Sequence, residues 1–255
     1  MKQKKIQQLA SSSSLQVGMA TIKQSLPNPK ASQISPFLLL HHLTPIKVAA
    51  GIDPLGVGPH PHRGFEPITF LFSGGIEHRD SHGNHGILKG GDVQWMTAGR
   101  GIVHSERASK GFVAAGGTLE LVQLWVNLPK KDKMVTPQYQ DIKSEQIPVI
   151  TRDNGKVKIR VIAGDFEDTK GAASTFTPIN ALHVLMKAGS KTDLNISSGF
   201  NSFVYVLGGN INTQNTDIEA TQLAIFSEEG NFTSITANED SHFLLLSGEP
   251  INEKV

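Results

Sequence analysis

The chain contains no cysteine among its 255 residues. Disulfide bonds, thiol nucleophiles, iron–sulfur clusters and Cys-ligated zinc are therefore excluded. The chain also has no large excess of charge of one sign, with 24 lysines and arginines and 23 aspartates and glutamates. This balance argues against direct binding to nucleic acid or to a membrane. No apolar run approaches the roughly 18 residues of a membrane-spanning helix. The opening residues, MKQKKIQQLASSSS, lack the apolar segment of a secretory signal, and we expect a cytoplasmic protein.

Turn-forming residues, by contrast, are plentiful, with 25 glycines and 13 prolines. From Ile34 onward they interrupt short apolar runs every 8–12 residues or so, a spacing that is typical of all-β sandwiches and barrels. Residues 119–126 (LELVQLWV) alternate with apolar groups on both faces, which predicts a strand that is covered on both sides. The sequence therefore predicts an all-β fold with few short helices.

The apolar alternation stops between Pro129 and Pro148 and then resumes, which predicts two domains. Residues 70–75 and 204–209 each form a predicted strand that ends in a Gly-Gly turn, so the halves resemble each other. We expect an internal repeat of two similar antiparallel β-barrels in tandem. The predicted parts are an N-terminal arm with a serine run (1–25), a first barrel (26–135), a connection (136–155) and a second barrel (156–255).

Eight of the ten histidines lie between His41 and His104. One residue separates His60 from His62 and His104 from Glu106, so on extended strands both members of a pair project from one face. Two such pairs on facing strands would direct three imidazoles and one carboxylate to a common point. This donor set suits a first-row divalent metal ion. Zinc usually closes its coordination with four ligands, so a site that stays open to substrate or dioxygen favours iron or manganese.

The other histidines in this half are weaker candidates for metal ligands. His78, His82 and His85 form a rival cluster, but the glycines around them favour a hairpin loop over a helix. His41 and His42 are adjacent, so on a strand they face opposite ways and cannot both line one site.

Two long segments resemble signature segments of the pirin family. They are residues 59–66 (PHPHRGFE) and 91–106 (GDVQWMTAGRGIVHSE). Shorter similarities occur at residues 124–129, 134–139 and 144–148. The resemblance is close from Pro36 to Pro148 and looser beyond.

The resemblance implies a bicupin, in which two jelly-roll-like barrels follow one another and the N-terminal barrel holds one metal ion. Its ligands here would be His60, His62, His104 and Glu106. Glu66 and Arg63 are expected beside the ligands, and no metal is implied for the second barrel. The family favours Fe(II) as the cofactor, with manganese, nickel, copper, cobalt and zinc as alternatives.

The chain departs from the family pattern in two places. Where pirins usually carry acidic residues, this chain has His41 and His42, so we expect the edge of the pocket or the surroundings of the metal to differ. The chain also stops soon after residues 248–250, whereas pirins usually carry a C-terminal extension.

Members of the family cleave quercetin with O2 and release carbon monoxide. The resemblance therefore implies a metal-dependent quercetin 2,3-dioxygenase that acts on a flavonol or a related phenolic compound, with Glu106 as the catalytic base. Other pirins are described as regulators. The alternative is thus a non-catalytic, redox-responsive iron-binding protein that acts through protein partners, and a third hypothesis is a metal-storage or vestigial domain.

Overall fold

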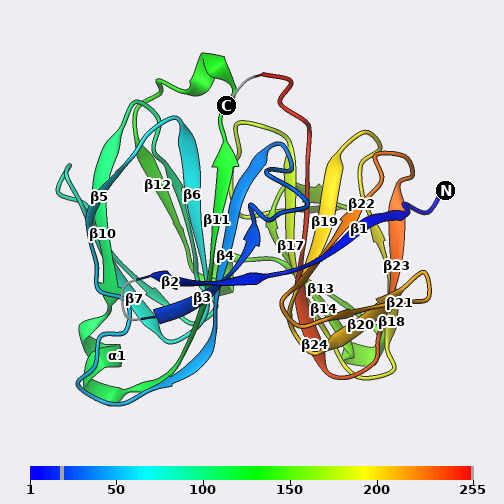
Figure 1. Ribbon diagram of the computed structural model, residues 1–255, viewed down its shortest axis with the longest axis horizontal. Helices are drawn as coiled ribbons and strands as arrows, with labels where there is room; N and C mark the ends of the chain where they lie inside the picture. Colours follow the sequence, from blue (N-terminus) through cyan, green and yellow to red (C-terminus); the bar gives the residue numbers. More distant parts are fainter. Residues whose placement is uncertain (18–19, 254–255) are drawn as a thin grey trace. The chain divides into compact units, whose positions relative to one another are not determined.

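Strands form nearly all of the regular structure in the computed structural model, which describes residues 1–17 and 20–253 (Figure 1). The chain divides into two compact units. The N-terminal unit comprises Ser13–Pro27, Phe37–Ser144 and Glu253–Val255, and the C-terminal unit comprises Met1–Ser12, Asn28–Pro36 and Glu145–Asn252. In the described part of the chain, no helix has the length and hydropathy that crossing a membrane requires.

Two antiparallel sheets build the N-terminal unit. The seven-stranded sheet has the order β12-β9-β6-β11-β4-β3-β2. Its strands are β2 (Ser13–Val17), β3 (Ala20–Leu26), β4 (Phe37–Val48), β6 (Phe65–Ser73), β9 (Val93–Thr97), β11 (Gly117–Asn127) and β12 (Gln138–Ile142). The four-stranded sheet has the order β5-β10-β7-β8. Its strands are β5 (Val57–His62), β7 (Gly75–Asp80), β8 (His85–Lys89) and β10 (Ile102–Ala108), and the helical segments nearby are α1 (Lys110–Ala115) and η1 (Lys130–Asp132).

The C-terminal unit repeats this arrangement. Its seven-stranded sheet has the order β1-β22-β19-β24-β17-β14-β13 and its four-stranded sheet the order β18-β23-β20-β21. The strands of the first sheet are β1 (Ile6–Ser11), β13 (Val149–Arg152), β14 (Val157–Ala163), β17 (Ile179–Met186), β19 (Asn201–Gly208), β22 (Gln222–Phe226) and β24 (Ser241–Gly248). Those of the second are β18 (Lys191–Asn195), β20 (Asn210–Thr213), β21 (Thr216–Glu219) and β23 (Phe232–Ala237). The short segments are β15 (Asp165–Phe166), β16 (Thr169–Lys170) and η3 (Asp153–Gly155).

The Gly-Gly turns occupy equivalent places in the two units. Gly74 follows β6 with φ +94°, and Gly209 follows β19 with φ +85°. Both values lie in the left-handed region that favours glycine. The predicted internal repeat is therefore confirmed by strand order as well as by turn chemistry.

Strand β11 shows how the alternating pattern positions the site. Leu121, Gln123 and Trp125 line a cavity between the two sheets of the N-terminal unit. Leu124 and Val126, on the opposite face of β11, are fully buried. The prediction of a strand covered on both faces is thus confirmed.

The structure differs from the sequence prediction in the form of the sheets. Each unit consists of open antiparallel sheets with the strand order of a cupin rather than of a closed barrel. The predicted connection (136–155) contains β12, η2 (Ser144–Gln146) and β13. The boundary between the units falls inside it, at Ser144 and Glu145.

Residues 1–25, which we expected to form an arm, contain strands. Strand β1 pairs antiparallel with β22 at the edge of the C-terminal unit's sheet. Its register shifts between Ile6 and Gln8, so Ile6 and Leu9 both pack against the apolar core despite their spacing of three residues. This β-bulge hides the two-residue period, which is why alternation did not reveal the strand.

The side chain of Lys4 binds the first residues of the chain to the rest of the C-terminal unit. Its side chain is fully buried, and Nζ donates to the carbonyl oxygens of Ser227 (2.8 Å), Glu228 (2.9 Å) and Phe200 (3.3 Å). Replacing Lys4 with methionine keeps the length of the side chain but leaves these acceptors without their donor. We expect the free energy of unfolding to fall by about 3 kcal/mol in urea denaturation. The neighbouring exposed residue provides the control Lys5→Met, and equal stabilities for the two variants would contradict this role of Lys4.

Candidate metal centre and its cavity

The three predicted histidine ligands meet on two adjacent strands of the four-stranded sheet. Strand β5 pairs antiparallel with β10, so that His60 lies opposite His104 and His62 lies opposite Ile102. One ring nitrogen from each of His60, His62 and His104 lies within 4.8 Å of the others, and Nε2 of His60 is 3.1 Å from Nε2 of His104. These residues could hold a metal ion, and no other such group of three or more His, Asp or Glu residues occurs within residues 1–17 and 20–253.

The hydrogen bonds of His60 determine which of its nitrogens can bind a metal. Its Nδ1 lies 2.9 Å from the carbonyl oxygen of Gly58. A carbonyl only accepts, so Nδ1 carries the hydrogen and Nε2 carries the lone pair. That lone pair is on the nitrogen nearest His104. This tautomer, with one nitrogen donating to a backbone carbonyl, is the arrangement found around metal-ligating histidines.

Burial keeps His62 and His104 neutral. Desolvation lowers the pKa of His62 to about 4, and the neighbouring His60 lowers it further. Desolvation lowers the pKa of His104 to about 3, again with His60 as the second cause. Both rings are therefore unprotonated at neutral pH, so a metal ion would not have to displace protons from them.

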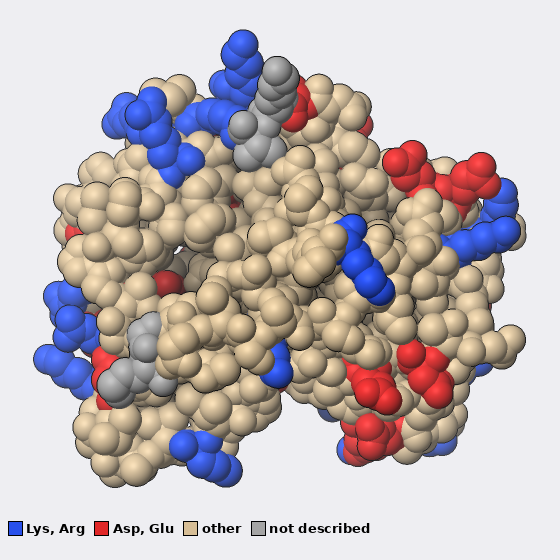
Figure 2. Space-filling view, in the orientation of Figure 1, with Lys and Arg blue, Asp and Glu red and all other residues tan. Residues whose placement is uncertain are grey.

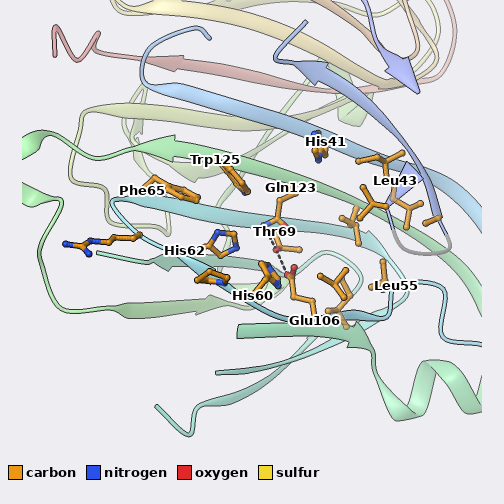
Figure 3. Close-up of a pocket in the computed structure, with 18 residues that line it drawn as sticks. His41, Leu43, Leu55, His60, His62, Phe65, Thr69, Glu106, Gln123 and Trp125 are labelled. Carbon is orange, nitrogen blue, oxygen red and sulfur yellow. Dashed lines mark hydrogen bonds between the residues drawn. The ribbon is translucent and has the colours of Figure 1, made fainter. Parts of the chain in front are cut away.

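Glu106 lies in the same cavity but outside the group of three histidines. The register between β10 and β5 shifts between His104 and Glu106. Oε1 of Glu106 accepts a hydrogen bond from Oγ1 of Thr69 at 3.3 Å (Figure 3). Desolvation raises the pKa of Glu106, against the opposing effects of His60 and of the Thr69 hydrogen bond. Its predicted role as a fourth ligand stays a prediction.

The cavity has a volume of about 420 Å³ and is lined by residues from both sheets. This volume lies within the range of roughly 300–1,000 Å³ that is usual for small-molecule sites. Figure 2 shows the N-terminal unit hollowed on the face in view. Apolar side chains such as Leu43, Leu55, Phe65 and Trp125 form much of the wall (Figure 3). In the sequence, these apolar residues look like any other core residues. Only their alternation along a strand could have indicated that they line a cavity.

Arg63 and Glu66, both expected beside the ligands, differ in their positions. Arg63 lines the cavity. On β6, Thr69 lies opposite Gln123, and both residues line the cavity. Glu66 comes three residues earlier, opposite Val126, and therefore lies on the other face of the strand. Glu66 is therefore directed away from the cavity. Glu66 is 1% exposed, and its Oε1 accepts a hydrogen bond from Oγ1 of Thr97 at 2.7 Å. The expected role of Glu66 beside the ligands stays a prediction.

The position of Glu66 leads to a pH-dependent prediction. Desolvation raises its pKa from 4.5 to about 7. The folded protein therefore binds more protons than the unfolded chain between about pH 4.5 and 7, and its stability falls as the pH rises through this window. Glu66→Gln removes this titration, so its stability relative to the original protein should increase by up to about 3 kcal/mol between pH 4.5 and pH 8. Urea denaturation at both pH values tests this, and a difference that does not change with pH would contradict it.

The rival histidines form a hairpin, as the glycines predicted. Strands β7 and β8 pair antiparallel, with His82 in the turn between them. His78 is buried against Tyr139, with ring centroids 4.8 Å apart, and Nε2 of His85 lies 3.2 Å from Oε1 of Glu77. The rings of His78 and His85 thus have structural partners, and His78, His82 and His85 do not form a group of metal donors of their own.

His41 and His42 face opposite sides of β4, as predicted. His41 lines the cavity. His42 is fully buried, and its Nε2 lies 3.3 Å from Oε1 of Glu120. Only His41 can therefore contribute to the cavity.

Comparison with known proteins places these features in a family. Residues 19–126 match the family model described as Pirin, and residues 181–255 match the model of the Pirin C-terminal cupin domain. Human pirin is 38% identical over 244 residues, which cover 92% of this chain and 79% of the human protein.

Solved structures agree with the sequence comparison. The crystal structure of a quercetin 2,3-dioxygenase from Acinetobacter baumannii is 40% identical, with a TM-score of 0.94 over 98% of this chain and 88% of that one. A bacterial pirin from Escherichia coli in complex with nickel(II) is 21% identical, with a TM-score of 0.74 over 95% of this chain and 98% of that one, and shares the fold. The two matched models and the identity to human pirin show that this chain belongs to the pirin family.

Proposed function

We propose that this protein is a metal-dependent dioxygenase that cleaves quercetin or a related flavonol with O2 and releases carbon monoxide. The main support is the convergence of His60, His62 and His104, of which His60 and His62 line a largely apolar cavity of about 420 Å³. A site with accessible nitrogen donors beside an apolar chamber suits a planar aromatic substrate that also carries metal-binding oxygens. The similarity to the Acinetobacter baumannii quercetin 2,3-dioxygenase supports the same substrate class.

The donors fit a first-row divalent metal. Neutral imidazoles and a carboxylate are the ligands that Fe(II) takes in open catalytic sites, and we propose Fe(II) held by His60, His62, His104 and Glu106. The lone pair on Nε2 of His60, fixed by the Gly58 carbonyl, supports this proposal. Manganese, nickel, copper, cobalt and zinc accept the same donors. When bound, the ion supplies Lewis-acid and redox chemistry toward the flavonol and O2.

Glu106 is the proposed base for the 3-hydroxyl proton of the flavonol. Nε2 of Gln123 donates to Oγ1 of Thr69 at 3.4 Å, and the Thr69 hydroxyl donates in turn to Oε1 of Glu106. This chain of donors orients the carboxylate and leaves Oε2 to accept the proton. The desolvation that raises the pKa of Glu106 also makes its carboxylate a stronger base.

The aromatic side chains at one end of the cavity would fix the orientation of the His62 ring and exclude water. The rings of Phe65 and Trp125 lie 4.5 Å apart, and each contacts the ring of His62, at centroid distances of 5.2 and 5.3 Å. Such packing restricts rotation of the imidazole. It also replaces water around the reacting atoms by apolar surface.

Flavonol binding tests this proposal without turnover. Under argon, quercetin added to Fe(II)-loaded protein should change the absorption spectrum of the metal, because its 3-hydroxyl and 4-carbonyl oxygens can both reach a metal ion. The His60→Ala, His104→Ala variant should show no such change. A spectrum that responds to oxidation of the iron but not to quercetin would contradict the proposal and favour the redox-responsive regulatory function.

A further inference from the structure

His41 occupies a wall of the cavity that the proposed chemistry leaves without a role. It comes from β4 in the seven-stranded sheet, whereas His60 and His62 come from β5 in the four-stranded sheet (Figure 3). The third clustered histidine, His104, comes from β10 of the four-stranded sheet. The side chains of Ile22, Leu43 and Leu121 line the same cavity. A polar ring is therefore placed in largely apolar surroundings, on the opposite sheet from the candidate metal ligands.

The partner of His41 fixes its tautomer. Strand β3 brings Gln24 opposite His41. Nε2 of Gln24 donates to the carbonyl oxygen of Pro27 at 2.9 Å, so the amide oxygen Oε1 is the atom that lies 2.9 Å from Nε2 of His41. An amide oxygen only accepts, and Nε2 of His41 must therefore carry the hydrogen. Nδ1 is left with the lone pair and can only accept.

The ring of His41 is also neutral. Burial lowers its pKa to about 4, so at neutral pH it carries no positive charge. A neutral acceptor attracts hydrogen-bond donors and gives no stabilisation to a carboxylate. A phenolic hydroxyl is the donor that a flavonol offers away from its metal-binding oxygens.

We propose that His41 recognises a phenolic hydroxyl on the part of the substrate remote from the metal, which donates its hydrogen bond to Nδ1. This inference rests on the proposed function and names the substrate class more narrowly, as polyhydroxylated flavonols. A substrate without this hydroxyl would leave the acceptor on this half-buried ring without its donor, so the site should discriminate against such analogues. His41 thereby becomes a specificity determinant.

Two flavonols separate recognition by His41 from binding at the metal. Quercetin carries hydroxyls on both of its outer ring systems, whereas 3-hydroxyflavone keeps only the metal-binding pair of oxygens. Affinities for both are measured under argon with Fe(II)-loaded protein. In His41→Leu, the preference for quercetin over 3-hydroxyflavone should fall about three- to tenfold, the equivalent of one hydrogen bond. His41→Gln keeps an acceptor and should restore most of the preference.

A third variant tests the tautomer itself. Gln24→Leu leaves the imidazole in place but removes the acceptor that holds hydrogen on Nε2, so the preference should fall by less than in His41→Leu. An unchanged preference in His41→Leu, or equal losses of affinity for both flavonols, would overturn the inference while leaving the proposed function intact. Failure of both flavonols to bind the metal-loaded original protein would instead contradict the proposed function, and the inference with it.

Discussion

Replacing His60 and His104 together with alanine is expected to reduce bound metal from about one ion per chain to almost none. Their Nε2 atoms lie 3.1 Å apart, and they supply two of the three nitrogens in the cluster. The remaining His62 and the proposed ligand Glu106 would supply only two protein donors, which is too few for a stable site. Metal content after identical loading and desalting, measured by elemental analysis, tests this expectation.

A matched control distinguishes loss of the site from loss of histidine in general. His82→Ala, His85→Ala also removes two imidazoles, but from the hairpin outside the clustered group. This control should keep its metal. Equal metal content in the two double variants would contradict the assignment of the site to His60 and His104.

Glu106→Gln is expected to lower the rate of flavonol cleavage by about 10²–10⁴-fold, the usual contribution of a positioned base. Glutamine has the same shape and can still accept from Oγ1 of Thr69, but its amide cannot take the 3-hydroxyl proton. The variant should keep at least part of its metal because the three histidines remain. The measurement is the turnover rate per bound metal ion.

The control for this prediction is an exposed carboxylate. Glu145→Gln changes the charge of the chain by the same amount and lies outside the cavity. Its rate per metal ion should match that of the original protein. Full activity in Glu106→Gln would remove this residue from the mechanism.

The spacing of two residues predicted a compact group of donors, which the three histidines form. Glu106 lines the cavity, and its role as a ligand stays a prediction. The spacing of two residues was sufficient for His60 and His62, because β5 and β10 are extended and lie side by side. For Glu106 the same argument assumed regular pairing, but the register shifts between His104 and Glu106. A β-bulge re-directs a side chain without leaving a clear mark in the alternating pattern.

Contacts that depend on pairing between separate strands could not be predicted from the sequence. The all-β class followed from alternation and turns, and the internal repeat was visible in the Gly-Gly turns, but the strand order of each unit was not predicted. The contact of His41 with Gln24, by contrast, depends on the register between β3 and β4. Glu66 is a simpler case, since counting along β6 places it on the far face once Thr69 is known to line the cavity.

Carbon monoxide release from quercetin under air tests the central claim most directly. Fe(II)-loaded protein should release carbon monoxide as the flavonol is consumed. Metal-free protein, the His60→Ala, His104→Ala variant and Glu106→Gln should release almost none. Absence of carbon monoxide from protein that demonstrably holds its metal and binds quercetin would contradict the dioxygenase function.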